Sequence, residues 1–235
     1  MLDLTLLRHF CDRFYGYGVA DAPHWFISME EGGGKTEAEI NERLAAWNKR
    51  GQRELEDVAE YHEAIGQSKW FSSRPPIQRT WAAMIRILLA MAGQSTDVES
   101  VRRYQRDRLA RTGSATRLSP LFPLPAQSLD HWHYPRWSEG SHFANRQAYR
   151  AEFEAARVAH LASAINQHAP STVAFFGTSY LAYWSRIAGV DFHATEEGTL
   201  IGASRKSRFV ICRHPATKGI ANEYFVSAGR ALGAA

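Results

Sequence analysis

Two adjacent glutamates and a run of three glycines form the most unusual stretch of this 235-residue sequence, SMEEGGGKT at residues 28–36. Carboxylates at the end of a buried strand can orient a water molecule or stabilise a cationic sugar, and a glycine loop beside them lets a substrate approach closely. Cleavage of a glycosidic bond requires this arrangement. We therefore take Glu30 as the first candidate catalytic residue and Glu31 as the second.

The same stretch permits two other interpretations. In the first, it is a flexible glycine turn into a helix capped by Thr36, with Glu39 completing a capping box. In the second, Gly34-Lys35-Thr36 ends a phosphate-binding P-loop. Against the P-loop, Met29 stands where the first glycine belongs, and the two glutamates would repel a triphosphate.

A further candidate lies near the C-terminus, where an apolar run ends in Cys212-Arg213-His214-Pro215. A histidine at the end of a strand can hydrogen-bond the negative charge that develops on a leaving group. By itself, a His-Pro pair is more typical of a structural histidine. Paired with Glu30 at another strand end, His214 becomes our third candidate catalytic residue.

The elements that must position these residues are buried strands and amphipathic helices. Apolar runs at residues 24–29, 172–177 and 208–212 predict strands, and residues 117–124 form a fourth candidate whose prolines place it at a strand end or in a loop. Apolar spacing predicts helices near residues 40–47, 55–62, 77–89 and 149–164, with Pro75 and Pro76 in the first turn of the third. This pattern predicts an α/β fold with a mainly parallel sheet and ligands at the carboxyl ends of its strands.

Composition narrows the class of protein. The chain has 28 Lys plus Arg against 24 Asp plus Glu, a net charge of +4, two cysteines and 45% hydrophobic residues. These values are typical of a folded soluble protein, and two cysteines argue against a disulfide or four-cysteine scaffold. The sequence contains no apolar run long enough for a membrane span. We expect a single domain over residues 1–235: a cytoplasmic monomer with no cofactor, no metal and no membrane partner.

In order and spacing, these motifs resemble the uracil-DNA glycosylase superfamily. Residues 28–32 (SMEEG) fall on its first motif and residues 214–216 (HPA) on its second, while residues 122–125 (FPLP) and 175–177 (FFG) look like the segments between them. The resemblance covers about residues 15–224. It implies a three-layer α/β/α fold with a central, mainly parallel, four-stranded sheet. It also implies that Glu30 positions water and stabilises an oxocarbenium sugar, and that His214 stabilises the departing base.

Departures from the family pattern bear on the substrate. Uracil-specific members carry an asparagine near the end of the central strand, which residues 115–120 (ATRLSP) lack, and the glycine run widens the space beside the base. The resemblance therefore implies a monofunctional DNA glycosylase that releases a modified pyrimidine, such as glucosylated hydroxymethylcytosine of phage DNA, in anti-phage defence or base excision. The alternatives are a uracil-excising repair enzyme, a non-catalytic DNA-binding module and a P-loop-like nucleotide binder.

The remaining candidates concern the base pocket and DNA. The base-pocket candidates surround the glycine loop or supply aromatic and hydroxyl groups: Ser28, Met29, Gly32, Gly33, Tyr17, Phe71 and Ser119. Basic residues, most of them around the last strand, are expected to bind DNA phosphates and so offset the cost of flipping the base. These DNA-binding candidates are Lys35, Arg205, Lys206, Arg208, Arg213, Thr217 and Lys218. A solvated basic face is the alternative interpretation of this cluster.

Overall fold

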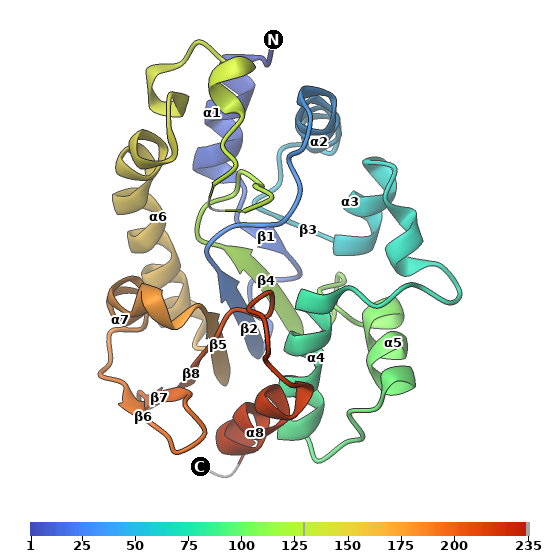
Figure 1. The fold of residues 1–235 in the computed structure, drawn as a ribbon, viewed down its shortest axis with the longest axis vertical. Helices are drawn as coiled ribbons and strands as arrows, with labels where there is room; N and C mark the ends of the chain where they lie inside the picture. Colours follow the sequence, from blue (N-terminus) through green and yellow to red (C-terminus); the bar gives the residue numbers. More distant parts are fainter. Residues whose placement is uncertain (129, 234–235) are drawn as a thin grey trace.

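The structure, a computed structural model, describes residues 1–128 and 130–233 of the chain. Within these residues, eight strands form one mixed sheet in the order β3-β1-β4-β2-β5-β8-β7-β6 (Figure 1). The strands are β1 (Gly16–Tyr17), β2 (His24–Ser28), β3 (Leu55–Glu56), β4 (Thr116–Pro120), β5 (Thr172–Phe176), β6 (His193–Ala194), β7 (Leu200–Ala203) and β8 (Arg208–Cys212). The prediction of the α/β class is confirmed.

Helices pack against the sheet from two sides. α1 (Leu4–Arg13), α6 (Arg146–His168) and α7 (Leu181–Ala188) lie on one side, and α4 (Arg79–Met91), α5 (Val98–Asp107) and α8 (Asn222–Gly233) lie on the other (Figure 1). α2 (Glu37–Lys49) and α3 (Val58–Ala64) pack against each other. Short 3-10 helices occupy connecting segments at Ser68–Phe71, Tyr134–Arg136, Ser141–Phe143 and Thr178–Tyr180. No helix in the described part of the chain has the length and apolar character needed to cross a membrane.

The four predicted strands form the parallel centre of the sheet. β2 pairs in parallel with β4 and with β5, and β5 pairs in parallel with β8. The register aligns Ser28 with Pro120 and Phe176 with Cys212, so these strands end at one edge of the sheet. The loops that carry the predicted catalytic residues therefore leave the sheet at the same edge.

The prediction of a four-stranded sheet is wrong, because the described residues contain eight strands. β1 is antiparallel to β4, and β7 and β6 add antiparallel strands beside β8. Three of the additional strands are two residues long, which is too short for a hydrophobic pattern to show. Gly16 permits the pairing of β1: its φ is +115°, and a Cβ there would lie 2.0 Å from the carbonyl oxygen of Leu118.

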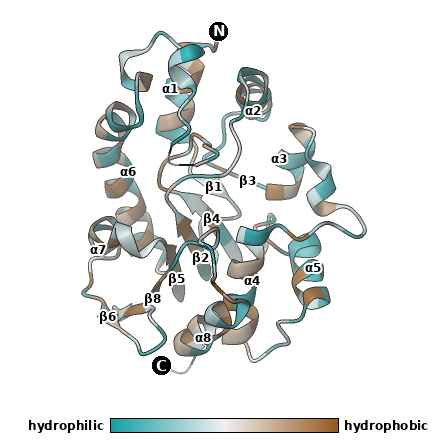
Figure 2. Ribbon diagram, in the orientation of Figure 1, coloured by the Kyte–Doolittle hydropathy of each residue, from teal (hydrophilic) through white to brown (hydrophobic). Residues whose placement is uncertain are grey.

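The hydrophobic core lies between the strands and the helices. Ile27, Phe175 and Val210 are fully buried, and Figure 2 shows hydrophobic residues on the central strands. Each such side chain contributes about 1.5–3 kcal/mol through its removal from water. The helices predicted near residues 40–47, 55–62, 77–89 and 149–164 are α2, α3, α4 and α6. Pro75 and Pro76 precede α4 and do not form its first turn, so that part of the prediction is wrong.

Candidate functional site

A cleft of about 1110 Å³ opens at the edge where the parallel strands end. Its volume lies just above the range of about 300–1,000 Å³ for small-molecule sites. Most of the residues predicted for the site line it: Tyr17, Ser28, Met29, Glu30, Glu31, Gly32, Gly33, Lys35, Ser119, Arg213, His214 and Thr217. The cleft therefore brings the three predicted catalytic residues together, although 183 positions separate Glu31 from His214 (214 − 31).

Glu30 is held in two ion pairs with α6. Its Oε2 accepts a hydrogen bond from Arg146, and its Oε1 accepts one from Nη2 of Arg150 at 2.8 Å. Arg146 also donates to the carbonyl oxygens of Ser128 and His131, at 2.7 and 3.1 Å. The Glu30 side chain is 9% exposed, and two guanidinium groups balance its charge. Glu30 therefore fastens the loop after β2 to α6.

Glu31 has different surroundings. Its Oε2 accepts hydrogen bonds from the Tyr17 hydroxyl at 3.1 Å and from Nη1 of Arg43 at 3.2 Å. Its Oε1 is buried and has no hydrogen-bond partner among the described residues. Burial raises the pKa of the Glu31 carboxyl, while the charge of Arg43 and the Tyr17 hydroxyl oppose that shift. Glu31 thus keeps one buried carboxylate oxygen without a hydrogen-bond partner beside the cleft.

His214 follows β8 and presents a hydrogen-bond donor. Its Nδ1 accepts from the backbone N–H of Ala216 at 3.2 Å, so the proton of the neutral ring lies on Nε2. Burial lowers the pKa of His214, which keeps the ring neutral at pH 7. The loop is fixed by two further contacts, from the Thr217 N–H to the His214 carbonyl at 2.9 Å and from Arg79 of α4 to the Thr217 carbonyl at 3.3 Å.

The glycine loop forms a capped helix start. Thr36 accepts from the Glu39 N–H at 3.2 Å, which confirms the predicted cap of α2. The Glu39 carboxylate accepts from the backbone N–H groups of Gly34 and Lys35, both at 2.9 Å. A P-loop would direct these amides toward a phosphate, but here a carboxylate binds them. The loop geometry therefore argues against a P-loop-like nucleotide binder.

Two other base-pocket candidates are engaged by protein groups. Ser119 is 2% exposed, and its hydroxyl accepts from Nε of Arg117 at 2.9 Å. Phe71 lies outside the cleft lining, because its ring packs against His62 and Trp81 with centroid distances of 5.7 and 5.4 Å. Phe71 therefore supports the cleft wall from behind and does not face a ligand directly.

The predicted basic cluster is divided between two edges of the sheet. Three of its members line the cleft: Lys35, Arg213 and Thr217. Lys218 is exposed in the loop after His214 without lining the cleft. A third group precedes or begins β8: Arg205, Lys206 and Arg208. A five-residue strand is about 16 Å long, so this group lies toward the opposite edge of the sheet from His214. Its contact with DNA stays a prediction.

An aromatic wall of the cleft was predicted only in part, because Tyr17 was a base-pocket candidate whereas His62 and Trp81 were not. We define it as Tyr17, His62, Trp70 and Trp81, which all line the cleft. The His62 ring lies 5.6 Å from that of Tyr17 and 5.3 Å from that of Trp81, and Trp70 lies 6.1 Å from Trp81. Apolar spacing assigned His62 and Trp81 to core-facing helix sides. A titratable histidine on an otherwise apolar face was the signal that could have indicated a site.

Comparison with known proteins does not assign a family. No protein-family model matches the sequence, and no curated protein matches it. In the described part of the chain, no three His, Cys, Asp or Glu residues are grouped to hold a metal ion. The cleft itself offers two chemical groups: a carboxylate with one unpaired, buried oxygen after β2, and a neutral imidazole donor after β8.

Proposed function

We propose that the protein is a DNA glycosylase that hydrolyses the N-glycosidic bond of a flipped base. The observation that carries this proposal is the presence of Glu31 and His214 in one cleft. Breaking an N-glycosidic bond places positive charge on the sugar and negative charge on the base. A carboxylate and a neutral donor from different strand ends stabilise both charges at once.

In the proposed reaction, the bond between C1′ and the base nitrogen breaks, and its electron pair leaves with the base. The Nε2–H of His214 hydrogen-bonds the base oxygen that gains negative charge. A water oxygen bonds to C1′, and its proton passes to Glu31 and then to solvent. The departing base anion takes up a proton from solvent at the nitrogen that left C1′, and the products are a free base and an abasic deoxyribose. Glu30, which the motif favours by position, has both oxygens bound by arginines, so we assign it the positioning of the loop.

Two features support the resemblance to the uracil-DNA glycosylase superfamily. β4, β2, β5 and β8 are mutually parallel, and the two motifs follow β2 and β8 at one edge. The cleft volume of about 1110 Å³ supports a substrate larger than uracil. At the end of β4, the Ser119 hydroxyl is engaged by Arg117 and offers no amide to read uracil. We therefore propose a modified pyrimidine, such as glucosylated hydroxymethylcytosine of phage DNA, as the substrate of a cytoplasmic defence or repair enzyme.

The test is incubation of the protein with genomic DNAs that carry different cytosine and thymine modifications, followed by alkaline cleavage at abasic sites and mass spectrometry of the released base. We expect release from at least one modified DNA. Glu31→Gln should lower the rate about 10²–10⁴-fold while DNA affinity persists. Glu42→Gln is the matched control, because Glu42 is an exposed glutamate of the same cleft, and it should keep the wild-type rate.

Other outcomes would favour the alternatives. Faster release of uracil than of every modified base would support a uracil-excising repair enzyme. Tight binding of DNA without release of any base, unaffected by Glu31→Gln and His214→Ala, would support a non-catalytic DNA-binding module and refute the glycosylase.

A further inference from the structure

His62 on α3 is a buried histidine that the proposed reaction does not use. It lines the cleft, is 7% exposed, and its Nδ1 lies 2.7 Å from the carbonyl oxygen of Val58. That contact requires the proton of the neutral ring on Nδ1, so Nε2 carries a lone pair. No described residue hydrogen-bonds this Nε2. His62 therefore presents an acceptor, whereas His214 presents a donor.

The surroundings of His62 keep its ring neutral. Burial, followed by the charge of Arg43, lowers the pKa of His62 to about 4. The rings of Tyr17, Phe71 and Trp81 lie around it, with centroid distances of 5.6, 5.7 and 5.3 Å. Because these rings leave the side chain only 7% exposed, a group that projects from a ligand reaches Nε2 more easily than the body of a ring does.

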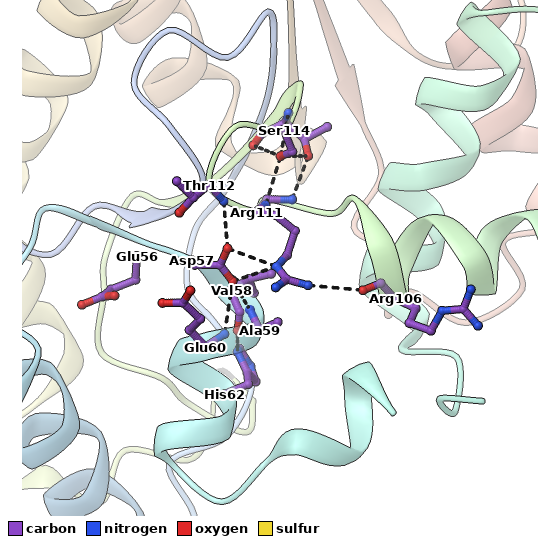
Figure 3. A network of polar contacts seen from close by, with 12 residues as sticks. Glu56, Asp57, Val58, Ala59, Glu60, His62, Arg106, Arg111, Thr112 and Ser114 are labelled. Carbon is purple, nitrogen blue, oxygen red and sulfur yellow. Dashed lines mark hydrogen bonds and ion pairs between the residues drawn. The ribbon is translucent and has the colours of Figure 1, made fainter. Parts of the chain in front are cut away.

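The helix that carries His62 is firmly anchored. Asp57 caps α3, and Figure 3 shows the contacts that converge on its carboxylate. The donors are the N–H groups of Ala59, Glu60 and Thr112 at 3.0, 3.1 and 2.8 Å, and Nε of Arg111 at 2.8 Å. Burial alone would raise the pKa of Asp57, but the backbone hydrogen bonds and the charge of Arg111 outweigh it and lower the pKa. The cap stays charged, and His62 is held in place before any ligand enters.

α4 connects the walls that carry the two histidines. Trp81 contacts the His62 ring, and two residues earlier Arg79 donates to the Thr217 carbonyl in the loop of His214. His62, Trp81, His214 and Thr217 line the cleft, whereas Arg79 does not. The cleft therefore has an acceptor on the wall of α3 and a donor in the loop after β8.

We propose that His62 determines specificity by accepting a hydrogen bond from an exocyclic amino group of the flipped base. This inference rests on the proposed function. A cytosine-type base carries an amino group at C4 and a carbonyl at C2, which match an acceptor at His62 and a donor at His214. A uracil-type base carries a carbonyl at C4, whose lone pairs would face that of Nε2 and leave a buried acceptor unpaired. The site accordingly selects amino-bearing pyrimidines, 5-substituted cytosines included, over the matching uracils.

The first measurement needs no catalysis. Protein labelled with ¹⁵N-histidine is titrated with cytosine, 5-hydroxymethylcytosine, uracil and 5-hydroxymethyluracil as free bases. The two cytosines should shift the Nε2 resonance of His62, and the two uracils should bind about tenfold more weakly. His62→Phe should lose this preference, because it keeps an aromatic ring but removes the acceptor, while His62→Gln should retain it through the amide oxygen.

His160→Phe is the matched control for loss of a histidine. His160 stacks on Tyr15 and bonds Glu54 outside the cleft lining, so its replacement should leave base preference unchanged. Circular dichroism establishes that each variant is folded. Should His62→Phe not fold, the Nε2 resonance of wild-type His62 decides the matter, because it should shift with the two cytosines and not with the two uracils.

Three results would overturn the inference: equal affinity of the wild type for matched cytosine and uracil bases, an unchanged preference in folded His62→Phe, or no shift with any of the four bases at their solubility limits. Failure of the proposed function is distinguishable, because it is the absence of base release from every DNA tested. Release of a uracil-type base faster than its cytosine counterpart overturns the role of His62 but leaves a glycosylase.

Discussion

Replacement of Glu30 by glutamine tests whether its role is structural. Its carboxylate binds Arg146 and Arg150, and the three side chains are 9%, 12% and 20% exposed. A hydrogen bond to a charged group contributes about 1.5–3 kcal/mol. Glutamine keeps one acceptor oxygen but loses the charge and with it both ion pairs, its NH₂ group cannot accept from the second arginine, and two arginines are left beside each other. We expect Glu30→Gln to lower the free energy of unfolding by about 3 kcal/mol.

Glu31→Gln is the matched comparison at the next position. Burial raises the pKa of Glu31, so the folded protein favours the uncharged carboxyl more than the unfolded chain does. Glutamine resembles that uncharged form, and its oxygen can still accept from Tyr17 or Arg43. We therefore expect Glu31→Gln to change the free energy of unfolding by less than about 1 kcal/mol, although it abolishes the proposed catalytic carboxylate.

Thermal unfolding followed by circular dichroism distinguishes the two variants. In a protein of this size, 1 kcal/mol shifts Tm by about 2–4 °C, so Glu30→Gln should melt about 6–12 °C below the wild type and Glu31→Gln within about 4 °C of it. Well below its Tm, Glu30→Gln should still release base, whereas Glu31→Gln should release it about 10²–10⁴-fold more slowly. The reasoning is refuted if Glu30→Gln melts with the wild type, or if Glu31→Gln is the less stable variant.

Three further predictions concern stability and thiol reactivity. The pKa of His62 is about 4 in the folded protein, and its ordinary value is 6.5. Above pH 6.5 the ring is neutral in both the folded and the unfolded protein, whereas below pH 6.5 the unfolded chain takes up a proton that the folded protein does not. Between pH 6.5 and 4 the free energy of unfolding should fall by about 3 kcal/mol more in the wild type than in His62→Phe. Urea titrations at each pH measure this fall, and an equal fall in the two proteins would contradict the prediction. Cys11 and Cys212 are fully buried, and burial raises the pKa of both thiols, so Ellman's reagent should label neither in the folded protein and both in denaturant. Gly34→Ala places a Cβ 2.4 Å from a backbone oxygen at a φ of +70° and should cost about 2 kcal/mol or more, whereas Gly51→Ala, with open space around it, should cost about 1 kcal/mol in the same melts.

The ends of the strands that carry the site could be predicted because each strand is a local apolar run in the sequence. The runs at residues 24–29 and 208–212 end within one residue of the ends of β2 and β8. Helical stretches between the runs require crossovers, and crossovers make neighbouring strands parallel. From that reasoning alone, Glu30 and His214 had to reach the same edge of the sheet. β1, β3 and β6 were missed because two residues carry no periodicity.

The partners of the site residues could not be predicted because they come from distant segments. Arg146 and Arg150 lie one turn apart on α6, a spacing equally typical of a solvated helix face, and 116 positions separate Arg146 from Glu30. The basic residues around β8 were expected to act together because they are neighbours in sequence. They lie at opposite ends of the strand. The place of His62 in the cleft was missed because an apolar helix face can border a cleft as well as a core.

The contrast between Glu30 and Glu31 shows that backbone direction decides which carboxylate remains open. Successive side chains point to opposite sides of an extended chain, and here Glu30 contacts α6 while Glu31 contacts Tyr17 of β1 and Arg43 of α2. Glu30 and Glu31 lie beyond Ser28, the last residue of β2, so the path of the chain after the strand sets these surroundings. It places Glu30 between two arginines and leaves one oxygen of Glu31 without a partner. Motif position alone favoured Glu30, since a motif names the residue types but not the side from which their partners come.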